Sequence, residues 1–497
     1  MKVKTVGLLS ALGMMLTSVT VWSVTKPAET PIAPDEPVVP QIATSSGGSE
    51  FGGAQFTAGQ TLMLEGRLGH TRLLADRENE SFLFLNVTGE QAAAGSSSRG
   101  LNLAIVLDRS GSMKGQALEN ARAAASGMVR RLREGDAVSV VAYNSTTQVV
   151  VPPTTIDESS RERVIAALAG IDARGDTCIS CGIDAGVELL RQRSGMIDRM
   201  LLLSDGEATA GVRDIDGFRN IAANVRRLGA AISSIGVDVD YNERIMAALA
   251  QESNGHHYFA ARASDLPRVF DEELASLVKT VGRGAEVAVD LGPGVEVEQV
   301  LDRTFRREGN RLIVPLGDFA AGEQKTVLAK LRIPRGATGE RPVADVRLSY
   351  DDLSANRKGE CAGKLSIELT GDANQISPLD PLVLARVQRS ETASVLTEAN
   401  RLFAQGDVEA ARRKLSQKLD SLRDGRTSAL RAAPKTRARE VEKDFERQEA
   451  ALGAANDGFA EAPAASAPGG APPRPAESRE GKTQVRSNQK SAVDLAF

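Results

Sequence analysis

The sequence predicts an α/β protein in which a doubly wound, mostly parallel sheet is accompanied by a β-sandwich domain and a C-terminal helical segment. Three patterns lead to this fold class. Short apolar strands alternate with amphipathic helices over residues 99–281, which is typical of a parallel sheet covered by helices. Strand-like alternation of apolar and polar residues occupies 56–98 and 282–372. Apolar residues at helical spacing recur over 378–452.

Length and composition narrow the class of function. The chain has 497 residues, enough for about two to four domains. Its 61 Lys and Arg residues against 65 Asp and Glu residues give a formal net charge of −4. The protein therefore has no global cationic field, and we expect no nucleic-acid partner. Three cysteines are too few for a scaffold built on disulfides.

The N-terminus predicts export. Lys2 and Lys4 precede residues 5–25, which carry no charge and are mostly apolar, so residues 1–25 are interpreted as a signal peptide or a signal anchor. The protein would then lie in the periplasm or at the cell surface, and residues 5–25 would be its only membrane segment if they anchor it to the inner membrane. Residues 26–55 are rich in Pro, Ser and Gly, which predicts a disordered linker.

The central α/β domain, residues 99–281, follows from alternating elements. Apolar runs predict strands buried on both faces at residues 101–107 and 200–203, and further strands are expected at 137–143, 230–237 and 258–260. Helical spacing of apolar residues predicts helices at 119–132, 164–171, 215–228, 244–250 and 266–278. In such sheets ligands bind at the carboxyl ends of the strands. Asp108 and Asp205 fall at these ends.

The flanking segments predict strands and then helices. Strands are expected at 286–291, 312–314, 326–331 and 343–348, and turns rich in Gly and Pro separate them, as in a β-sandwich. The strands of 56–98 either belong to the same sandwich, with the α/β domain inserted into it, or form a second β module. Helices are expected at 382–402, 408–422 and 437–452, and residues 453–497 are expected to be a disordered tail because Ala, Pro, Gly and Ser dominate them.

One loop carries oxygen ligands at regular spacing. Asp108, Ser110 and Ser112 follow the first buried strand, and one carboxylate and two hydroxyls on a tight loop can face one hard cation. Thr177 opens a later helix, and Asp205 ends the strand at 200–203. The motif alone is weakly specific, but the three elements in this order predict a metal site.

The order and spacing resemble the metal-ion-dependent adhesion site of von Willebrand factor type A domains, over roughly residues 100–280. Asp108, Ser110, Ser112, Thr177 and Asp205 match its five positions. The resemblance implies a Rossmann-like, doubly wound fold that holds Mg²⁺ at the edge of the sheet, with Mn²⁺ or Ca²⁺ as alternatives. The wider chain is similar to bacterial exported proteins that carry such a domain beside a β-sandwich and are often labelled calcium-activated chloride-channel-like.

Ligand counting explains how such a site would bind a partner. Two carboxylates and three hydroxyls do not complete the six-oxygen shell of Mg²⁺, so an Asp or Glu of a protein partner can supply a further ligand. The resemblance implies a cation-dependent adhesion or interaction module at the cell envelope that is not an enzyme. One alternative is an accessory regulator of a membrane transport or secretion assembly, in which the metal is structural. Another is an envelope hydrolase, but the sequence shows no catalytic base for Ser110.

The loop around Thr177 departs from the Gly-Gly-Thr-Asn pattern usual in that family. Asp176 adds negative charge beside the site, and Cys178 and Cys181 form a C-x-x-C pair at a helix start. In an oxidising compartment we expect a local disulfide that stiffens the Thr177 loop. A redox enzyme would need a thioredoxin-like context, and zinc would need a second ligand pair. Cys361 is the odd thiol.

Overall fold

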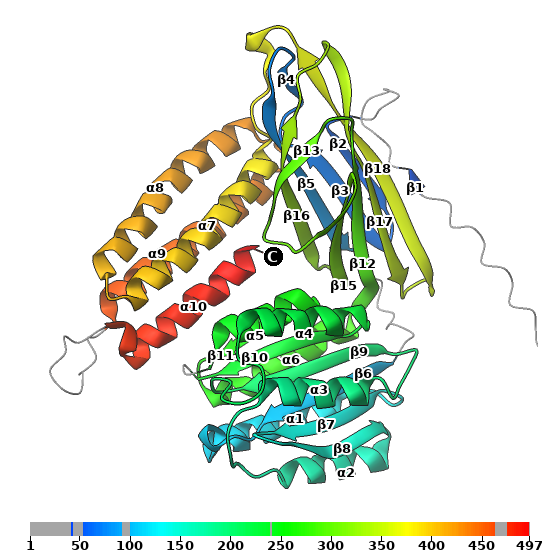
Figure 1. Ribbon diagram of the computed structural model, residues 1–497, viewed down its shortest axis with the longest axis vertical. Helices are drawn as coiled ribbons and strands as arrows, with labels where there is room; N and C mark the ends of the chain where they lie inside the picture. Colours follow the sequence, from blue (N-terminus) through cyan, green and yellow to red (C-terminus); the bar gives the residue numbers. More distant parts are fainter. Residues whose placement is uncertain (1–40, 43–52, 92–99, 239–240, 463–474, 497) are drawn as a thin grey trace, which may run out of the picture. The chain divides into compact units, whose positions relative to one another are not determined.

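The strands of the described residues form three sheets, one in the α/β domain and two in a β-sandwich (Figure 1). The computed structural model describes residues 41–42, 53–91, 100–238, 241–462 and 475–496. All of them lie in one compact unit, Val39–Phe497. The expected segments 1–25 and most of 26–55 lie outside the described residues. No helix among the described residues is long and apolar enough to cross a membrane.

The central sheet confirms the predicted doubly wound, mostly parallel architecture. Its strand order is β11-β10-β9-β6-β7-β8, and neighbouring strands are parallel except that β8 is antiparallel to β7. The strands are β6 (Leu101–Asp108), β7 (Ala137–Tyr143), β8 (Thr147–Thr155), β9 (Ile197–Ser204), β10 (Ala231–Val237) and β11 (His257–Ala260). Chain order and strand order reverse between β6 and β9, so the loops after these two strands meet at the carboxyl edge.

Helices cover both faces of this sheet. The helices are α1 (Gln116–Arg131), α2 (Glu158–Ala169), α3 (Ile179–Leu190), α4 (Ile215–Arg227), α5 (Glu243–Ser253) and α6 (Leu266–Val278). On β6, Leu103 and Ile105 enter the core shared with α1, α2 and α6, whereas Ala104 and Val106 enter the core shared with α3, α4 and α5. Burial on both faces explains why β6 is apolar from Leu103 to Leu107.

The strands before and after the α/β domain build one sandwich. One sheet pairs β1 (Gln41–Ile42), β18 (Arg357–Thr370), β17 (Gly339–Asp352), β12 (Thr280–Leu291), β15 (Arg311–Ala320) and β14 (Arg306–Glu308), with β4 (Arg72–Leu74) on β18. The other has the order β13 (Glu296–Leu301), β16 (Gln324–Ile333), β5 (Asn79–Gly89), β3 (Leu62–Leu68) and β2 (Gln55–Gly59). Because β5 is antiparallel to β16 and places Leu85 opposite Val327, both segments share two sheets. The α/β domain is therefore inserted between them, and the described strands before it belong to this sandwich rather than to a second β module.

The described residues of the C-terminal part form a group of four helices. They are α7 (Pro381–Ala404), α8 (Val408–Ala432), α9 (Ala438–Glu461) and α10 (Arg479–Ala496). Their shared core includes Phe403 and Phe459, whose rings stack with centroids 4.1 Å apart. Short 3-10 turns occur at Gly111–Met113, Ala263–Asp265, Ala373–Gln375 and Pro475–Glu477.

The expectation that residues 453–497 are a disordered tail is wrong for the described residues of this segment. α9 continues to Glu461, and α10 forms a further helix. The inward face of α10 consists of Gly481, Asn488, Ala492 and Leu495. Small and polar residues therefore replace the large apolar stripe that usually signals a helix in a sequence.

Candidate functional site

Asp108 lies at the end of β6, where the strand meets the first loop, and it is fully buried. Its Oδ1 accepts a hydrogen bond from the backbone N of Ser110 at 2.8 Å. Its Oδ2 accepts one from Ser204 Oγ at 2.8 Å and a longer one from Tyr143 OH at 3.4 Å. Three different segments therefore fix the orientation of this carboxylate.

Ser110 and Ser112 stand on the short 3-10 turn that follows Asp108. Their Oγ atoms are 3.0 Å apart, and Ser112 Oγ donates to Asp205 Oδ1 at 2.7 Å. Asp205 directly follows β9, the neighbour of β6 in the sheet. The structure thus brings together the first and third of the predicted ligand segments, which the topology places at one sheet edge.

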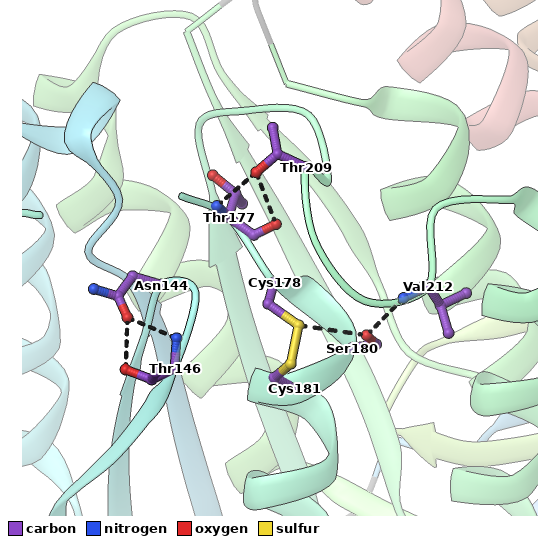
Figure 2. Close-up of a disulfide and its surroundings, with 8 residues drawn as sticks. All are labelled: Asn144, Thr146, Thr177, Cys178, Ser180, Cys181, Thr209 and Val212. Atoms are coloured by element: carbon purple, nitrogen blue, oxygen red, sulfur yellow. Dashed lines mark hydrogen bonds between the residues drawn. A yellow bond between two sulfur atoms is a disulfide. The ribbon is translucent and has the colours of Figure 1, made fainter. Parts of the chain in front are cut away.

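Thr177 is held by the loop that follows Asp205. Its backbone N donates to Thr209 Oγ1 at 2.9 Å, and its carbonyl oxygen accepts from the backbone N of Thr209 at 2.9 Å and of Ala210 at 3.1 Å. The next residue, Cys178, donates through its backbone N to the carbonyl of Asn144 at 3.0 Å. Figure 2 shows Thr177 beside Thr209, with the helix start directly below.

Cys178 and Cys181 form a disulfide within the first turn of α3 (Figure 2). The neighbouring Ser180 Oγ accepts a hydrogen bond from the backbone N of Val212 at 3.1 Å. Gly211 has φ of +70°, and a β-carbon there would lie 2.6 Å from Cys178 Sγ. Only a glycine lets the loop after Asp205 pack this closely on the disulfide. The disulfide is thus part of the packing that holds the Thr177 loop.

The hydroxyl groups of Ser112 and Thr177, which come from two different loops, both lie close to Gly206. A β-carbon at Gly206 would lie 3.6 Å from Ser112 Oγ and 3.8 Å from Thr177 Oγ1. Ser112 is also the donor to Asp205. The structure therefore gathers all five predicted ligands at the carboxyl edge. Ser204 and Tyr143, which hydrogen-bond to Asp108, were not identified from the sequence. Ser204 could have been suspected because it directly precedes Asp205 at a strand end, whereas nothing in the sequence marked Tyr143.

The two carboxylates are in an environment that disfavours their negative charge. Burial raises the pKa of Asp108, although hydrogen bonds from Ser110, Ser204 and Tyr143 oppose the effect. Burial also raises the pKa of Asp205 to about 6; the hydrogen bond from Ser112 opposes the rise, and the charge of Asp108 adds to it. Among the described residues, neither carboxylate takes part in an ion pair. A divalent cation would supply the missing positive charge.

The donor set fits Mg²⁺ better than a transition metal. Two carboxylates and three hydroxyls are hard oxygen ligands of the kind that Mg²⁺ and Ca²⁺ take. Within the described part of the chain, no group of three or more His, Cys, Asp or Glu residues is arranged to hold a metal. The candidate ligands therefore fit a cation that is bound by three neutral hydroxyls and only two negatively charged side chains.

The fold and this edge define a doubly wound α/β domain in which carboxylate and hydroxyl side chains gather after the two central strands. The model of the von Willebrand factor type A domain matches residues 102–272, and this segment is a von Willebrand factor type A domain. The chain is also similar in structure to the von Willebrand factor type A protein from Catenulispora acidiphila, with a TM-score of 0.63 and 17% identity. That match covers 75% of this chain and 89% of the other, and it shows a shared fold.

Curated relatives include bacterial proteins. The uncharacterized protein sll0103 of Synechocystis is 25% identical over 269 residues, which cover 52% of this chain and 63% of the relative. The uncharacterized protein YfbK of Escherichia coli is 27% identical over 249 residues, which cover 47% and 42%. A plant relative, the probable E3 ubiquitin-protein ligase WAVH2 of Arabidopsis thaliana, is 23% identical over 273 residues, covering 52% and 36%. The chain spans less than two thirds of the length of these relatives.

Proposed function

We propose that this protein is a divalent-cation-dependent protein-binding module in which Mg²⁺ bridges to an acidic residue of a partner. Von Willebrand factor type A domains generally bind protein partners and commonly bind a divalent metal, and this chain contains such a domain. The observation that carries the finer proposal is the convergence of Asp108, Ser110, Ser112, Thr177 and Asp205 on one sheet edge.

The charges explain why the partner would be acidic. Asp108 and Asp205 together offset the two positive charges of Mg²⁺, and the remaining ligands are neutral. A cation with three neutral hydroxyl ligands can still bind a further oxygen ligand strongly. A carboxylate of a partner is a stronger ligand than water. The bound cation would also remove the charge repulsion between the two buried aspartates.

We also propose that the protein acts at the cell envelope after export and has no enzymatic activity of its own. Type A domains are mostly interaction modules. Among the described residues, Ser110 Oγ lies 3.0 Å from Ser112 Oγ, and the three histidines have their hydrogen bonds to other residues, Ser81, Glu273 and Ser234. The alternative is a structural cation within an accessory regulator of a transport or secretion assembly. Here the cation would stabilise the loops without touching the partner.

Titration calorimetry with Mg²⁺ tests the site. We expect wild type to bind one Mg²⁺ and Asp108→Ala to bind none while remaining folded. The matched control is Asp216→Ala, because Asp216 is exposed on α4. Retained Mg²⁺ affinity in Asp108→Ala would contradict the site. Affinity capture from envelope extract, in Mg²⁺ and in EDTA, then separates the two roles: a partner retained only with Mg²⁺ supports bridging, and metal-independent retention supports the structural alternative.

A further inference from the structure

The C-terminal helix α10 contacts the other helices and the α/β domain at the same time. Toward the other helices, Asn488 Nδ2 donates to Asn400 Oδ1 at 3.0 Å, and Asn400 Nδ2 donates to the carbonyl of Val485 at 3.0 Å. Asn488 and Asn400 are both buried. Figure 1 shows α10 in red alongside α7 and α9. These bonds fix α10 lengthwise on α7, because a shift along its axis would break the buried amide pair.

Toward the α/β domain, Arg486 reaches the start of α5. Its Nη1 donates to Glu243 Oε2 at 2.6 Å, and its Nη2 donates to the carbonyl of Tyr241 at 2.9 Å. The guanidinium also lies over the ring of Tyr241, 5.2 Å from its centroid. One arginine side chain thus makes three kinds of contact with two residues that lie 243 and 245 positions away along the chain.

The segment that Arg486 contacts is firmly packed in the domain. Tyr241 is fully buried, and its ring lies so close to Gly236 of β10 that a β-carbon there would be 2.1 Å from it. Glu243 is 4% exposed, and within the described part of the chain its Oε1 has no hydrogen-bond partner. Without Arg486, the Glu243 carboxylate would lose its charged partner in a buried place, which is strongly unfavourable.

The residue between these two connects to the metal-site loop. Asn242 caps α5 by accepting from the backbone N of Ile245 at 3.1 Å. Its side-chain Nδ2 donates to Glu207 Oε2 at 2.7 Å, and its backbone N donates to the carbonyl of Gly206 at 3.4 Å. Gly206 and Glu207 directly follow Asp205, so Asn242 helps to fix the loop that carries this ligand.

We propose that Arg486 of α10 is a positioning residue for the metal site, acting through Tyr241, Asn242 and Glu243 on the loop of Asp205. Without Arg486, the Glu243 carboxylate must become hydrated or protonated. Hydration requires residues 241–243 to move outward, and this movement withdraws Asn242 from Gly206. The metal site then loses part of its pre-organisation. Because coupling between two sites is reciprocal, a cation at the site should in turn tighten the docking of α10. The affinity part of this inference rests on the proposed function.

Hydrogen exchange of the full chain in EDTA tests the positioning without any metal. We expect Arg486→Ala to speed exchange in the backbone around Gly206 and in the first turn of α5, relative to wild type. The matched control is Lys490→Ala, which also removes one positive charge from α10 but whose ion pair is with Asp494 of the same helix. Exchange that rises in α10 alone, with the Gly206 loop unchanged, would overturn the proposal.

Calorimetry with Mg²⁺ provides the second readout. Arg486→Ala should weaken Mg²⁺ binding by about three- to tenfold, and Arg486→Lys, which keeps one charged donor, should fall between it and wild type. This second variant decides the question if Arg486→Ala does not fold. Equal Mg²⁺ affinity in wild type and both Arg486 variants would overturn the proposal. If wild type itself binds no Mg²⁺, the proposed function fails, and the exchange experiment in EDTA still decides whether Arg486 positions the loop.

Discussion

Replacing Asp205 by Asn should have opposite effects on stability with and without a divalent cation. Asp205 is 7% exposed and lies beside Asp108, and its pKa is raised to about 6, chiefly by burial. Its negative charge is therefore a burden on the metal-free folded state. The Oδ1 that accepts from Ser112 is kept as an amide oxygen in Asp205→Asn, so this substitution removes the charge and changes little else.

The size of the stability change follows from the raised pKa of Asp205. A carboxyl whose folded pKa lies above its unfolded value of 3.8 stabilises the fold fully below pH 3.8, and this stabilisation is lost as the pH rises through about 6. At pH 7.5 the ionised Asp205 therefore costs up to about 3 kcal/mol, at 1.36 kcal/mol per pKa unit. In EDTA we expect Asp205→Asn to exceed wild type in its free energy of unfolding by about 1–3 kcal/mol, because the amide recovers only part of this.

With Mg²⁺ the order should reverse. A cation at one thousand times its Kd stabilises wild type by about 4.1 kcal/mol, which exceeds the advantage of the variant in EDTA, whereas the variant has lost one of two charged ligands and should gain little. Urea denaturation in EDTA and in Mg²⁺ measures both differences, and Asp216→Asn serves as the exposed control on α4. The reasoning is refuted if Asp205→Asn is the less stable protein in EDTA, or if Mg²⁺ stabilises it as much as wild type.

Two further predictions concern other groups of the α/β domain. Cys178 and Cys181 should resist alkylation until a reductant is added, as mass spectrometry of labelled peptides can show; labelling of both thiols without reductant would contradict their pairing. Burial alone would lower the pKa of His256, but Glu273 and Glu323 raise it to about 9, so its contribution to stability is complete below pH 6.5 and lost as the pH rises through 9. Since the imidazole is 35% exposed, wild type should lose only about 1–2 kcal/mol more than His256→Gln over this interval in pH-dependent urea denaturation; equal slopes would argue against the pair.

The positions of the candidate ligands Asp108 and Asp205 could be predicted from the sequence because both residues follow strands with a clear apolar pattern. β6 and β9 are apolar on both faces, so Asp108 and Asp205 had to lie at strand ends, and parallel pairing brings such ends to one edge. Of the partners that orient Asp108, Tyr143 carried no such signal, and Ser204 was marked only by its place directly before Asp205. Tyr143 and Ser204 lie 35 and 96 positions away, and only the strand order of the sheet makes them neighbours.

β8 was absent from the predicted elements for a different physical reason. Of its nine residues only Val151 is buried, and the strand contains Pro152 and Pro153. An edge strand can accept proline because one side of it has no ladder bonds to lose, and its exposed positions need no apolar alternation. The sequence of such a strand therefore resembles that of a loop, although β8 closes one side of the sheet.

The helix α10 shows the limit of pattern-based inference most clearly, because its stability depends on specific polar pairs. Asn488 is buried only because Asn400 supplies an amide partner, and an isolated sequence window contains no trace of that partner. Arg486 is likewise typical of a solvated face until Glu243 and Tyr241 come within hydrogen-bond distance. Buried apolar residues recur with a regular period that can be seen in a short stretch of sequence. A buried polar contact can be recognised only when both of its distant residues are considered together. Residues that position a site from another part of the chain thus belong to the class that sequence patterns fail to show, and α10 is where such residues occur in this protein.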